Sequence, residues 1–279
     1  MSFGHTYTSH FNEKNACCVL LSKTIHQLTG WPNFLRRLQW HDFRDLVAIR
    51  NGMRIIDLGA GQMQYTSELA KKSADGIVAV DLDPPAGSVG LVKCGINIVR
   101  ADATSLPFKD HRVDCILMSS LLQMVSEPLE LLRECKRILG PGGHMVLSVP
   151  NQYQYIPLFT KSFISPVLRR AFRLPNADSE IVILLNERFH VSGPQGYYST
   201  DQLTTLLESS GFRITDHKYS PGRFGSLLWE LAVLGYIRFG NIAFHLLFLS
   251  YPLARLFDII VKPTAGSEHI VKVVADYER

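Results

Sequence analysis

A glycine-containing turn between an apolar strand and a helix constrains the fold of this chain more than any other feature. Residues 53–58 form a short apolar run that ends in the sequence DLGAG at residues 57–61, and apolar residues recur at helical spacing after it. Gly59 and Gly61 allow the backbone to turn tightly, and they let a ligand approach the amides at the start of the helix. The segment predicts a strand, a turn and a helix with a binding surface at the turn, although a plain connecting turn has the same pattern.

Short apolar segments alternate with helical segments along the rest of the chain. We expect further strands at residues 77–80, 97–101, 113–118, 145–149, 212–217 and 269–275. A helix over residues 128–139 is expected to begin under a Ser126 cap, and another begins at a capping box formed by Ser199 and Gln202. The alternation predicts parallel strands joined by right-handed crossovers, and hence a doubly wound α/β sheet with helices on both faces.

Acidic residues stand at the ends of two of these predicted strands. Asp81 ends the strand at 77–80, where a carboxylate can accept both hydroxyls of a nucleotide ribose, and Leu82 offers an apolar surface to an adenine. Asp102 follows the next strand and can accept the exocyclic amine of the adenine, while Ala103 leaves room for the ring. Each carboxylate taken alone is equally typical of a turn. Their order along the chain favours a nucleotide site.

Five motifs follow one another in the first half of the chain: IIDLGAG at residues 55–61, VDLD at 80–83, RADA at 100–103, VDCIL at 113–117 and LGPGG at 139–143. In sequence and order they resemble the successive motifs of class I S-adenosylmethionine-dependent methyltransferases, in the subgroup that contains quinone and small-molecule methyltransferases. The resemblance is closest over residues 53–150 and extends to 188–216. It implies a Rossmann-like seven-stranded sheet, mostly parallel with an antiparallel last strand. It also implies S-adenosyl-L-methionine as cofactor and S-adenosyl-L-homocysteine as product.

The resemblance also assigns cofactor-binding residues, grouped by the part of the ligand that they hold: Asp57, Gly59, Ala60 and Gly61 for the methionine part, Asp81 for the ribose, Leu82, Asp102 and Ala103 for the adenine, and Ser119 and Leu121 near the sulfonium. Two positions depart from the family pattern. Met63 replaces a third glycine, which we expect to reshape the cofactor pocket, and Gln123 and Met124 replace a pair of histidines that often supplies a base.

A sulfonium methyl group is already activated, so the transfer requires alignment in a water-poor site and no metal ion. An oxygen nucleophile would still gain from a general base. The candidates are His190, Tyr197 and Tyr198, and relatives carry a similar histidine followed by aromatic residues in this region. Each has a structural alternative: the histidine as a hydrogen-bonded core residue, the tyrosines as packing residues that fix the neighbouring helix.

Two stretches do not fit the regular alternation, residues 152–194 and 221–262. Both leave the sheet at the carboxyl edge of the strands, where ligands bind in open α/β sheets, so we expect helical cap insertions. The expected organisation is an N-terminal helical segment at residues 1–50 that covers the cofactor site, followed by a methyltransferase domain at 51–279.

The second insertion is strongly apolar. Its longer apolar piece, residues 239–254, is shorter than the roughly 20 residues that span a bilayer as a helix. Basic residues such as Arg223 and Lys262 flank the insertion. This pattern favours an interfacial helix pair that contacts a membrane through residues 221–262, and an acceptor that is a small hydrophobic molecule, a lipid or a lipid-linked compound. The alternatives are a lid made by the two insertions and a homodimer interface.

Composition narrows the remaining choices. A net charge of +4 without a stripe of Lys and Arg argues against a nucleic-acid partner. Five cysteines, an odd number without metal-ligand spacing, are typical of a reducing compartment, and Cys115 and Cys135 fall at core positions. The residues after Met1 lack the basic flank and apolar run of a secretory signal. We expect a cytoplasmic protein, with membrane association on the cytoplasmic face if the apolar insertion meets lipid.

Two other functions compete with the methyltransferase. A non-catalytic scaffold of the same fold would account for Met63 and for the missing histidine pair, and cofactor titration distinguishes it from an enzyme. An NAD(P)-dependent oxidoreductase would need a glycine where the chain has Gln64, so this alternative is disfavoured.

Overall fold

A seven-stranded sheet forms the centre of the computed structural model, which describes residues 34–72, 76–84, 96–151, 196–222, 251–260 and 266–277, together with Gly225 and Leu228. The strands are β1 (Ile55–Leu58), β2 (Ile77–Asp81), β3 (Asn97–Arg100), β4 (Val113–Ser119), β5 (Leu139–Pro150), β6 (Phe212–Gly222) and β7 (Gly266–Ala275). Their spatial order is β3-β2-β1-β4-β5-β7-β6. The first five strands pair in parallel, and β7 is antiparallel to both β5 and β6. The predicted fold class is confirmed.

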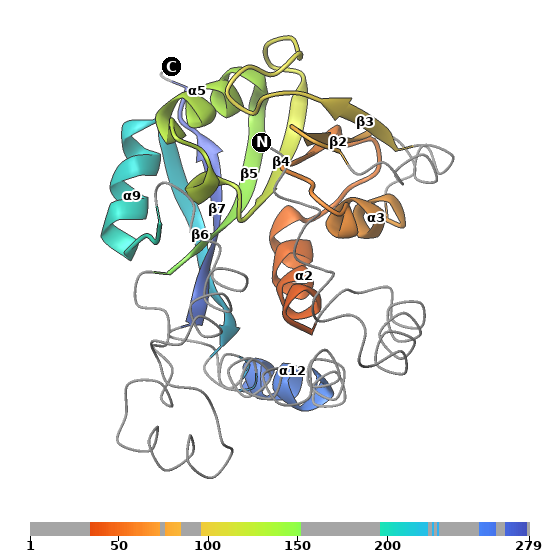
Figure 1. Cartoon of the computed structure of the whole chain (residues 1–279), viewed down its shortest axis with the longest axis vertical. Helices are drawn as coiled ribbons and strands as arrows, with labels where there is room; N and C mark the ends of the chain where they lie inside the picture. Colours follow the sequence, from red (N-terminus) through yellow and green to blue (C-terminus); the bar gives the residue numbers. More distant parts are fainter. Residues whose placement is uncertain are drawn as a thin grey trace, which may run out of the picture.

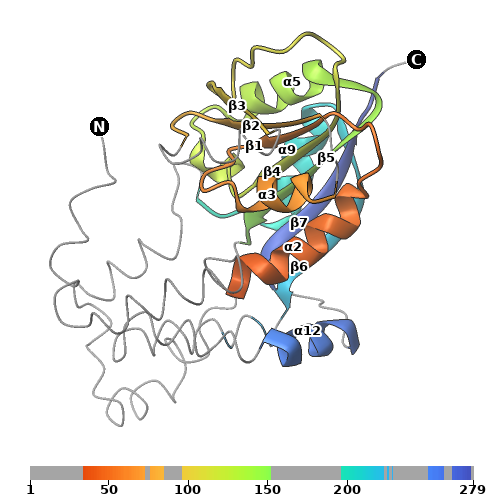
Figure 2. The same cartoon turned by 90° about the vertical axis from the view of Figure 1, so that its right-hand side faces the viewer.

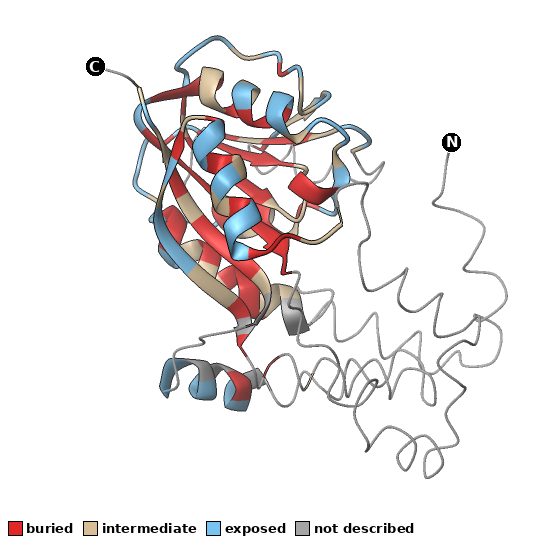
Figure 3. Cartoon of the chain, turned by 90° about the vertical axis from the view of Figure 1, so that its left-hand side faces the viewer, coloured by how far each residue is buried: buried red, intermediate tan, exposed pale blue. Residues whose placement is uncertain are grey.

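Helices cover both faces of this sheet. The described helices are α2 (Phe34–Val47), α3 (Gln64–Ala70), α5 (Pro128–Ile138), α9 (Thr200–Ser209) and α12 (Tyr251–Ile260), with a short 3-10 helix, η2 (Leu122–Met124), after β4. Figures 1 and 2 place α2 and α3 on one face, with α5 and α9 on the other. Figure 3 shows the central strands buried, the edge strands partly exposed and the outer sides of the helices exposed. A two-sided apolar core of this kind requires nearly continuous apolar strands, as the sequence has.

The two faces have separate cores. On one face, Leu131 and Cys135 of α5 and Leu207 of α9 pack against the sheet. On the other, Phe43 of α2 and Leu69 of α3 pack against it. Cys115 and Cys135 are buried free thiols, as expected, and burial raises the pKa of Cys115 to about 12. Neither thiol is therefore ionised near neutral pH.

One predicted helix boundary was wrong. Ser126 was expected to cap α5, but the N-cap is Glu127, and its side chain makes no cap hydrogen bond. The reason is Pro128, which takes the first helical position because its missing amide would have no partner there. At the start of α9, the capping box between Ser199 and Gln202 is confirmed, with the Gln202 amide donating to Ser199 Oγ at 3.1 Å.

Two strands are longer than the sequence pattern suggested. β5 begins at Leu139 and so includes the LGPGG segment, whereas the strand was expected at residues 145–149. β6 continues to Gly222, well past the apolar part of its sequence. It lies at the edge of the sheet, where one neighbour is enough to hold a strand with polar side chains.

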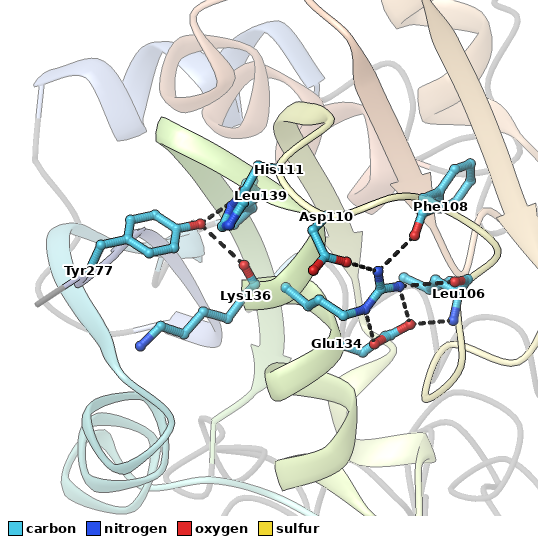
Figure 4. A network of polar contacts seen from close by, with 9 residues as sticks. Leu106, Phe108, Asp110, His111, Glu134, Lys136, Leu139 and Tyr277 are labelled. Atoms are coloured by element: carbon cyan, nitrogen blue, oxygen red, sulfur yellow. Dashed lines mark hydrogen bonds and ion pairs between the residues drawn. The ribbon is translucent and has the colours of Figure 1, made fainter.

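Arg137, near the end of α5, ties this helix to the loop between β3 and β4 (Figure 4). Its guanidinium donates to Glu134 Oε1 at 2.7 Å and to Asp110 Oδ1 at 2.6 Å, and to the carbonyls of Leu106 and Phe108 at 3.1 and 2.7 Å. Glu134 in turn accepts from the Leu106 amide. The loop that begins with Asp102 is thereby held against α5.

Most of the two predicted insertions, and residues 1–33 of the predicted N-terminal segment, lie outside the described residues. The described part of the second insertion includes α12, which contacts α2 and lies beyond the ends of β6 and β7 in Figures 1 and 2. The apolar piece expected at 239–254 ends inside α12, which continues to Ile260. Among the described residues, no helix combines the length and the hydropathy that crossing a membrane requires.

Candidate active site

A cavity of about 200 Å³ opens at the carboxyl edge of β1, β2, β3 and β4. It is lined mostly by apolar side chains, with two carboxylates among them: Leu58, Gly59, Val80, Asp81, Leu82, Ala101, Asp102, Ala103, Leu121, Met124 and Val125. Six of these are predicted cofactor-binding residues, so the ends of four separate strands converge as expected. The cavity combines a flat apolar interior with hydrogen-bond acceptors, which suits a nucleoside.

Asp81 connects the second strand to the glycine turn. Its Oδ2 accepts a hydrogen bond from the Gly61 amide at 2.8 Å, and its Oδ1 accepts one from the Asp83 amide at 2.9 Å. Each carboxylate oxygen has a second lone pair, so both can still accept from a ligand hydroxyl. The turn itself requires glycine at its first position, because Gly59 has a φ of 72°.

Asp102 has both of the roles that the sequence left open. It lines the cavity, and its Oδ1 also accepts hydrogen bonds from the Thr104 amide at 2.8 Å and the Thr104 hydroxyl at 2.7 Å. These bonds lower the pKa of Asp102 below its ordinary value, so the side chain is ionised at neutral pH and can accept from an amine.

Asp57 lies behind the cavity rather than in its wall. The side chain is buried, and its Oδ2 accepts a hydrogen bond from the Thr66 hydroxyl at 2.5 Å. Burial raises the pKa of Asp57 to about 6, although the hydrogen bonds from Thr66 oppose this shift. The charged form of Asp57 is therefore costly to bury. A cation bound close to it would lower its pKa again.

Leu121 closes the cavity over the turn. Its side-chain carbons lie 3.0 Å from the position that a Cβ on Gly59 would take. Ser119, which ends β4, and Ala60 and Gly61 do not line the cavity, although each lies within two residues of Leu121 or Gly59, which do. Ser120, which lies between Ser119 and Leu121 in the chain, has a φ of 53°, an unusual conformation for a serine and one that is concentrated at functional sites.

Met63 does not intrude on the cavity, contrary to the expectation. It has a φ of 58°, the left-handed conformation that a glycine would take, and is the N-cap residue of α3. Its side chain is buried in a cluster with Ala79 and Ile96. Met63 therefore takes a backbone conformation that favours glycine and directs its side chain into the core.

Tyr198 lies just beyond the carboxyl end of β5, where its amide donates to the Pro150 carbonyl at 3.1 Å. The side chain is buried, and its hydroxyl has no hydrogen-bond partner among the described residues. Burial raises the pKa values of both Tyr197 and Tyr198, so near neutral pH these phenols are donors rather than bases. His190, the remaining predicted base, lies outside the described residues.

A histidine pair that sequence reasoning missed holds the Tyr198 backbone. His269 Nε2 lies 3.1 Å from the Tyr198 carbonyl oxygen, and His269 Nδ1 lies 2.9 Å from His217 Nε2. Because a carbonyl can only accept, His269 donates through Nε2 and accepts from His217. Burial, and then the neighbouring His217, lower the pKa of His269 to about 4, so the pair is neutral at physiological pH.

Sequence reasoning also missed Met124 and Val125, which line the cavity from η2 and the residue after it, and Arg36, which reaches Ser119 from α2. The apolar residues carried a signal, since they follow β4 on the ligand edge. Among the described residues, no cluster of three or more metal-ligating side chains occurs.

The comparison with known proteins agrees with this geometry. A family model described as a methyltransferase domain matches residues 56–147. A demethylmenaquinone methyltransferase of Clavibacter sepedonicus is 30% identical over 177 residues, which cover 60% of this chain and 68% of that protein. A demethylmenaquinone methyltransferase of Tropheryma whipplei (strain Twist) is 27% identical over 208 residues, covering 73% of this chain and 84% of the relative.

The fold is also similar to those of solved structures. The [4+2]-cyclase SpnF superposes with a TM-score of 0.56 at 17% identity, over 86% of this chain and 81% of that one. At this identity the likeness concerns the fold alone. Together with the curated relatives and the convergence of the motif residues on one cavity, it leads to one conclusion: the chain belongs to the S-adenosylmethionine-dependent methyltransferases, with S-adenosylmethionine as its cofactor.

Proposed function

We propose that this methyltransferase acts on a lipid-soluble acceptor with a quinone-like ring, which it takes up at a membrane surface. The single observation that carries the proposal is the apolar surface of α12, on the side of the sheet where β6 ends and β7 begins. The curated relatives support the ring chemistry, since two of them are named demethylmenaquinone methyltransferases.

The residues present fit the cofactor. When bound, S-adenosylmethionine supplies a methyl group that its sulfonium has already activated. We assign the ribose hydroxyls to Asp81 and the adenine to Asp102, Leu82 and Ala103, because these residues join two carboxylate acceptors to apolar walls in one cavity. The methionine part is assigned to the Gly59–Gly61 turn above Asp57, and Ser119 and Leu121 to the neighbourhood of the sulfonium.

The acceptor would be positioned from the side of β5. We assign a positioning role to Tyr198, because its buried hydroxyl has no partner among the described residues and can donate to a ring oxygen. Tyr197 precedes it and is half-buried. A hydrogen bond to such an oxygen would favour the ionised form of the ring, which attacks the methyl group more readily than the neutral form does. His190 is assigned as the base that removes a proton from the acceptor.

The membrane contact rests on five exposed apolar side chains of α12: Leu253, Leu256, Phe257, Ile259 and Ile260. Ile260 is 71% exposed and Ile259 61%, whereas Ala254 of the same helix is buried. A short helix with one apolar surface turned outward is typical of segments that lie in the interface of a bilayer. An acceptor with a lipid tail would then reach the carboxyl edge without leaving the membrane.

Methyl transfer to demethylmenaquinol tests the acceptor. The purified full-length protein is incubated with S-adenosylmethionine carrying a labelled methyl group and with demethylmenaquinol in vesicles of phosphatidylcholine and phosphatidylglycerol. We expect labelled menaquinol by mass spectrometry. A protein that binds S-adenosylhomocysteine but leaves the quinol unmethylated would contradict the proposed acceptor.

Vesicle flotation tests the membrane contact. The double variant Ile259→Asp/Ile260→Asp places two charges on the exposed side of α12 and should no longer float with the same vesicles, while its cofactor affinity is retained. Leu129→Asp is the matched control, because Leu129 is also an exposed leucine but lies on α5. Equal flotation of the α12 variant and the wild type would show that α12 does not make the contact.

A further inference from the structure

A cation from the N-terminal part of the chain reaches the end of the central strand. Arg36 lies in α2, and its Nη1 donates to Ser119 Oγ at 3.0 Å and to Ser120 Oγ at 3.4 Å. Ser119 is the last residue of β4 and Ser120 follows it. The guanidinium therefore lies at the ligand-binding edge of the sheet, although its own helix packs against one face.

The surroundings of Arg36 include a buried donor that needs an acceptor. Gln39 Oε1 accepts from Tyr65 Oη at 2.9 Å and from Arg36 Nη1 at 3.3 Å. A guanidinium has no acceptor, so this contact fixes which end of the Gln39 amide is oxygen. Gln39 Nε2 then faces away from both donors. It is fully buried and has no hydrogen-bond partner among the described residues.

An unmatched buried donor of this kind is costly in a native protein and commonly marks a binding position. Here the amide nitrogen lies on the same side chain that Arg36 contacts, so two kinds of donor, one charged and one neutral, gather in one place. Their shared complement is an anionic oxygen group, and a carboxylate can accept from both.

The position of this cluster relates it to the cofactor cavity. Ser119 and Ser120 are followed directly by Leu121, which lines the cavity and packs over Gly59. The adenosyl end of the cavity carries carboxylates, Asp81 and Asp102, which suit hydroxyls and an amine. Arg36 does not line the cavity itself, but its guanidinium lies against Ser119 and Ser120, just before Leu121 in the chain. One carboxylate, Glu268, also lies here: it accepts from Ser120 Oγ at 3.5 Å, and its charge raises the pKa of Arg36. A ligand carboxylate bound by Arg36 would therefore share the guanidinium with Glu268.

We propose that Arg36 and Gln39 bind the carboxylate at the amino-acid end of S-adenosylmethionine. That carboxylate is the only anionic group of the cofactor, so a guanidinium that binds it would fix the direction in which the ligand lies. Arg36 then also joins α2 to the cofactor, and the helix closes the site by contacting the ligand.

Calorimetric titration with two ligands tests the proposal without an acceptor. S-adenosylhomocysteine carries the carboxylate, and its decarboxylated analogue lacks only that group. Replacing Arg36 by Met should weaken S-adenosylhomocysteine binding roughly ten- to a hundredfold, the range for a lost hydrogen bond to a charged group, and change binding of the analogue by less than about twofold. Gln39→Leu should give a smaller loss with the same selectivity.

Two further variants keep the test decisive. Arg44→Met is the matched control, because Arg44 lies on the same helix but is exposed and pairs with Asp45. It should bind both ligands as the wild type does. Arg36→Lys keeps the charge without the planar fork, so it should lose affinity only for the ligand with a carboxylate.

Equal weakening of both ligands in the Arg36→Met variant would overturn the proposal, since Arg36 would then act only by holding α2 in place. Unchanged binding of S-adenosylhomocysteine would overturn it as well. If the Met variant does not fold, the Lys variant decides, and an unchanged ratio between its two affinities counts against the assignment.

Discussion

Asp81, at the end of β2, accepts a hydrogen bond from the Gly61 amide with 2.8 Å between Oδ2 and nitrogen. The contact joins the end of one strand to the turn after its neighbour, and it places a carboxylate beside the amides at the start of α3. A residue whose expected role is to hold a ribose thus also shapes the turn that faces the rest of the ligand. Loss of its charge should therefore affect the site more than the fold.

Asp81→Asn should weaken S-adenosylhomocysteine binding roughly ten- to a hundredfold, because an amide is a poorer acceptor for ligand hydroxyls and can accept through only one of its two polar atoms. Isothermal titration calorimetry measures the loss. Asp83→Asn is the matched control, since Asp83 is exposed and does not line the cavity. A larger loss in the control than in Asp81→Asn would contradict the assignment.

Gly59→Ala should reduce both stability and cofactor affinity. Its φ of 72° costs an alanine roughly 1–2 kcal/mol, and the new Cβ would lie 3.0 Å from Leu121, which must then move toward the cavity. Gly142→Ala separates the two effects, because Gly142 has a φ of 78° and nothing within 4 Å of the added carbon. Urea unfolding should show similar losses for both variants, and titration should show lost affinity for Gly59→Ala alone.

The buried carboxylate of Asp57 predicts a pH dependence of stability. Its pKa is raised from 3.8 to about 6 in the folded protein, so the folded state holds the proton more tightly than the unfolded state does. The stabilisation is fully present below the lower value and is lost as the pH rises through the higher one. At about 1.4 kcal/mol per pKa unit, this amounts to roughly 3 kcal/mol.

Asp57→Asn removes this titration while keeping an oxygen that the Thr66 hydroxyl can donate to. Urea unfolding of the ligand-free protein at several pH values between about 4 and 7 should show the variant gaining stability relative to the wild type as the pH rises. The titration of His269 occurs in the same range but is common to both proteins, so it cancels in the difference. Parallel stability curves would mean that Asp57 is not the group responsible.

The contacts of Arg137 predict that a residue far from the ligand supports the adenine side of the cavity. Arg137→Met removes two hydrogen bonds to loop carbonyls and leaves partly buried Glu134 without its guanidinium, which should cost roughly 1–3 kcal/mol. Hydrogen exchange should accelerate over residues 104–111. Arg133→Met, an exposed arginine on the same helix that pairs with Glu130, should leave the loop protected. Equal exchange rates of the loop in both variants would show that Arg137 does not hold it in place.

Local signals in the sequence were sufficient for the sheet and for the adenosyl part of the site. The strands were recognisable because both faces of a parallel sheet are buried, and Asp81, Asp102 and Gly59 converge because parallel strands end at one edge. The α5 cap was misplaced by one residue because Pro128 decides the start of that helix more strongly than a serine does.

The remaining features depend on long-range contacts. Arg36 is 83 residues from Ser119, and His269 is 71 residues from the Tyr198 carbonyl that it binds. No periodicity in the chain connects such pairs, because a polar side chain in an amphipathic helix or strand has the same pattern whether it meets solvent or a buried partner. The polar end of β6 was missed for the same reason: β6 is an edge strand held by backbone pairing with β7.

The most direct test of the account is a crystal structure of the protein with S-adenosylhomocysteine. The account predicts the ribose hydroxyls within hydrogen-bond distance of Asp81, the adenine between Leu82 and Leu121 with its amine at Asp102, and the amino-acid end beside Ser119. A ligand bound elsewhere, or one lying in the opposite direction with its amino-acid end at Asp102, would contradict the account.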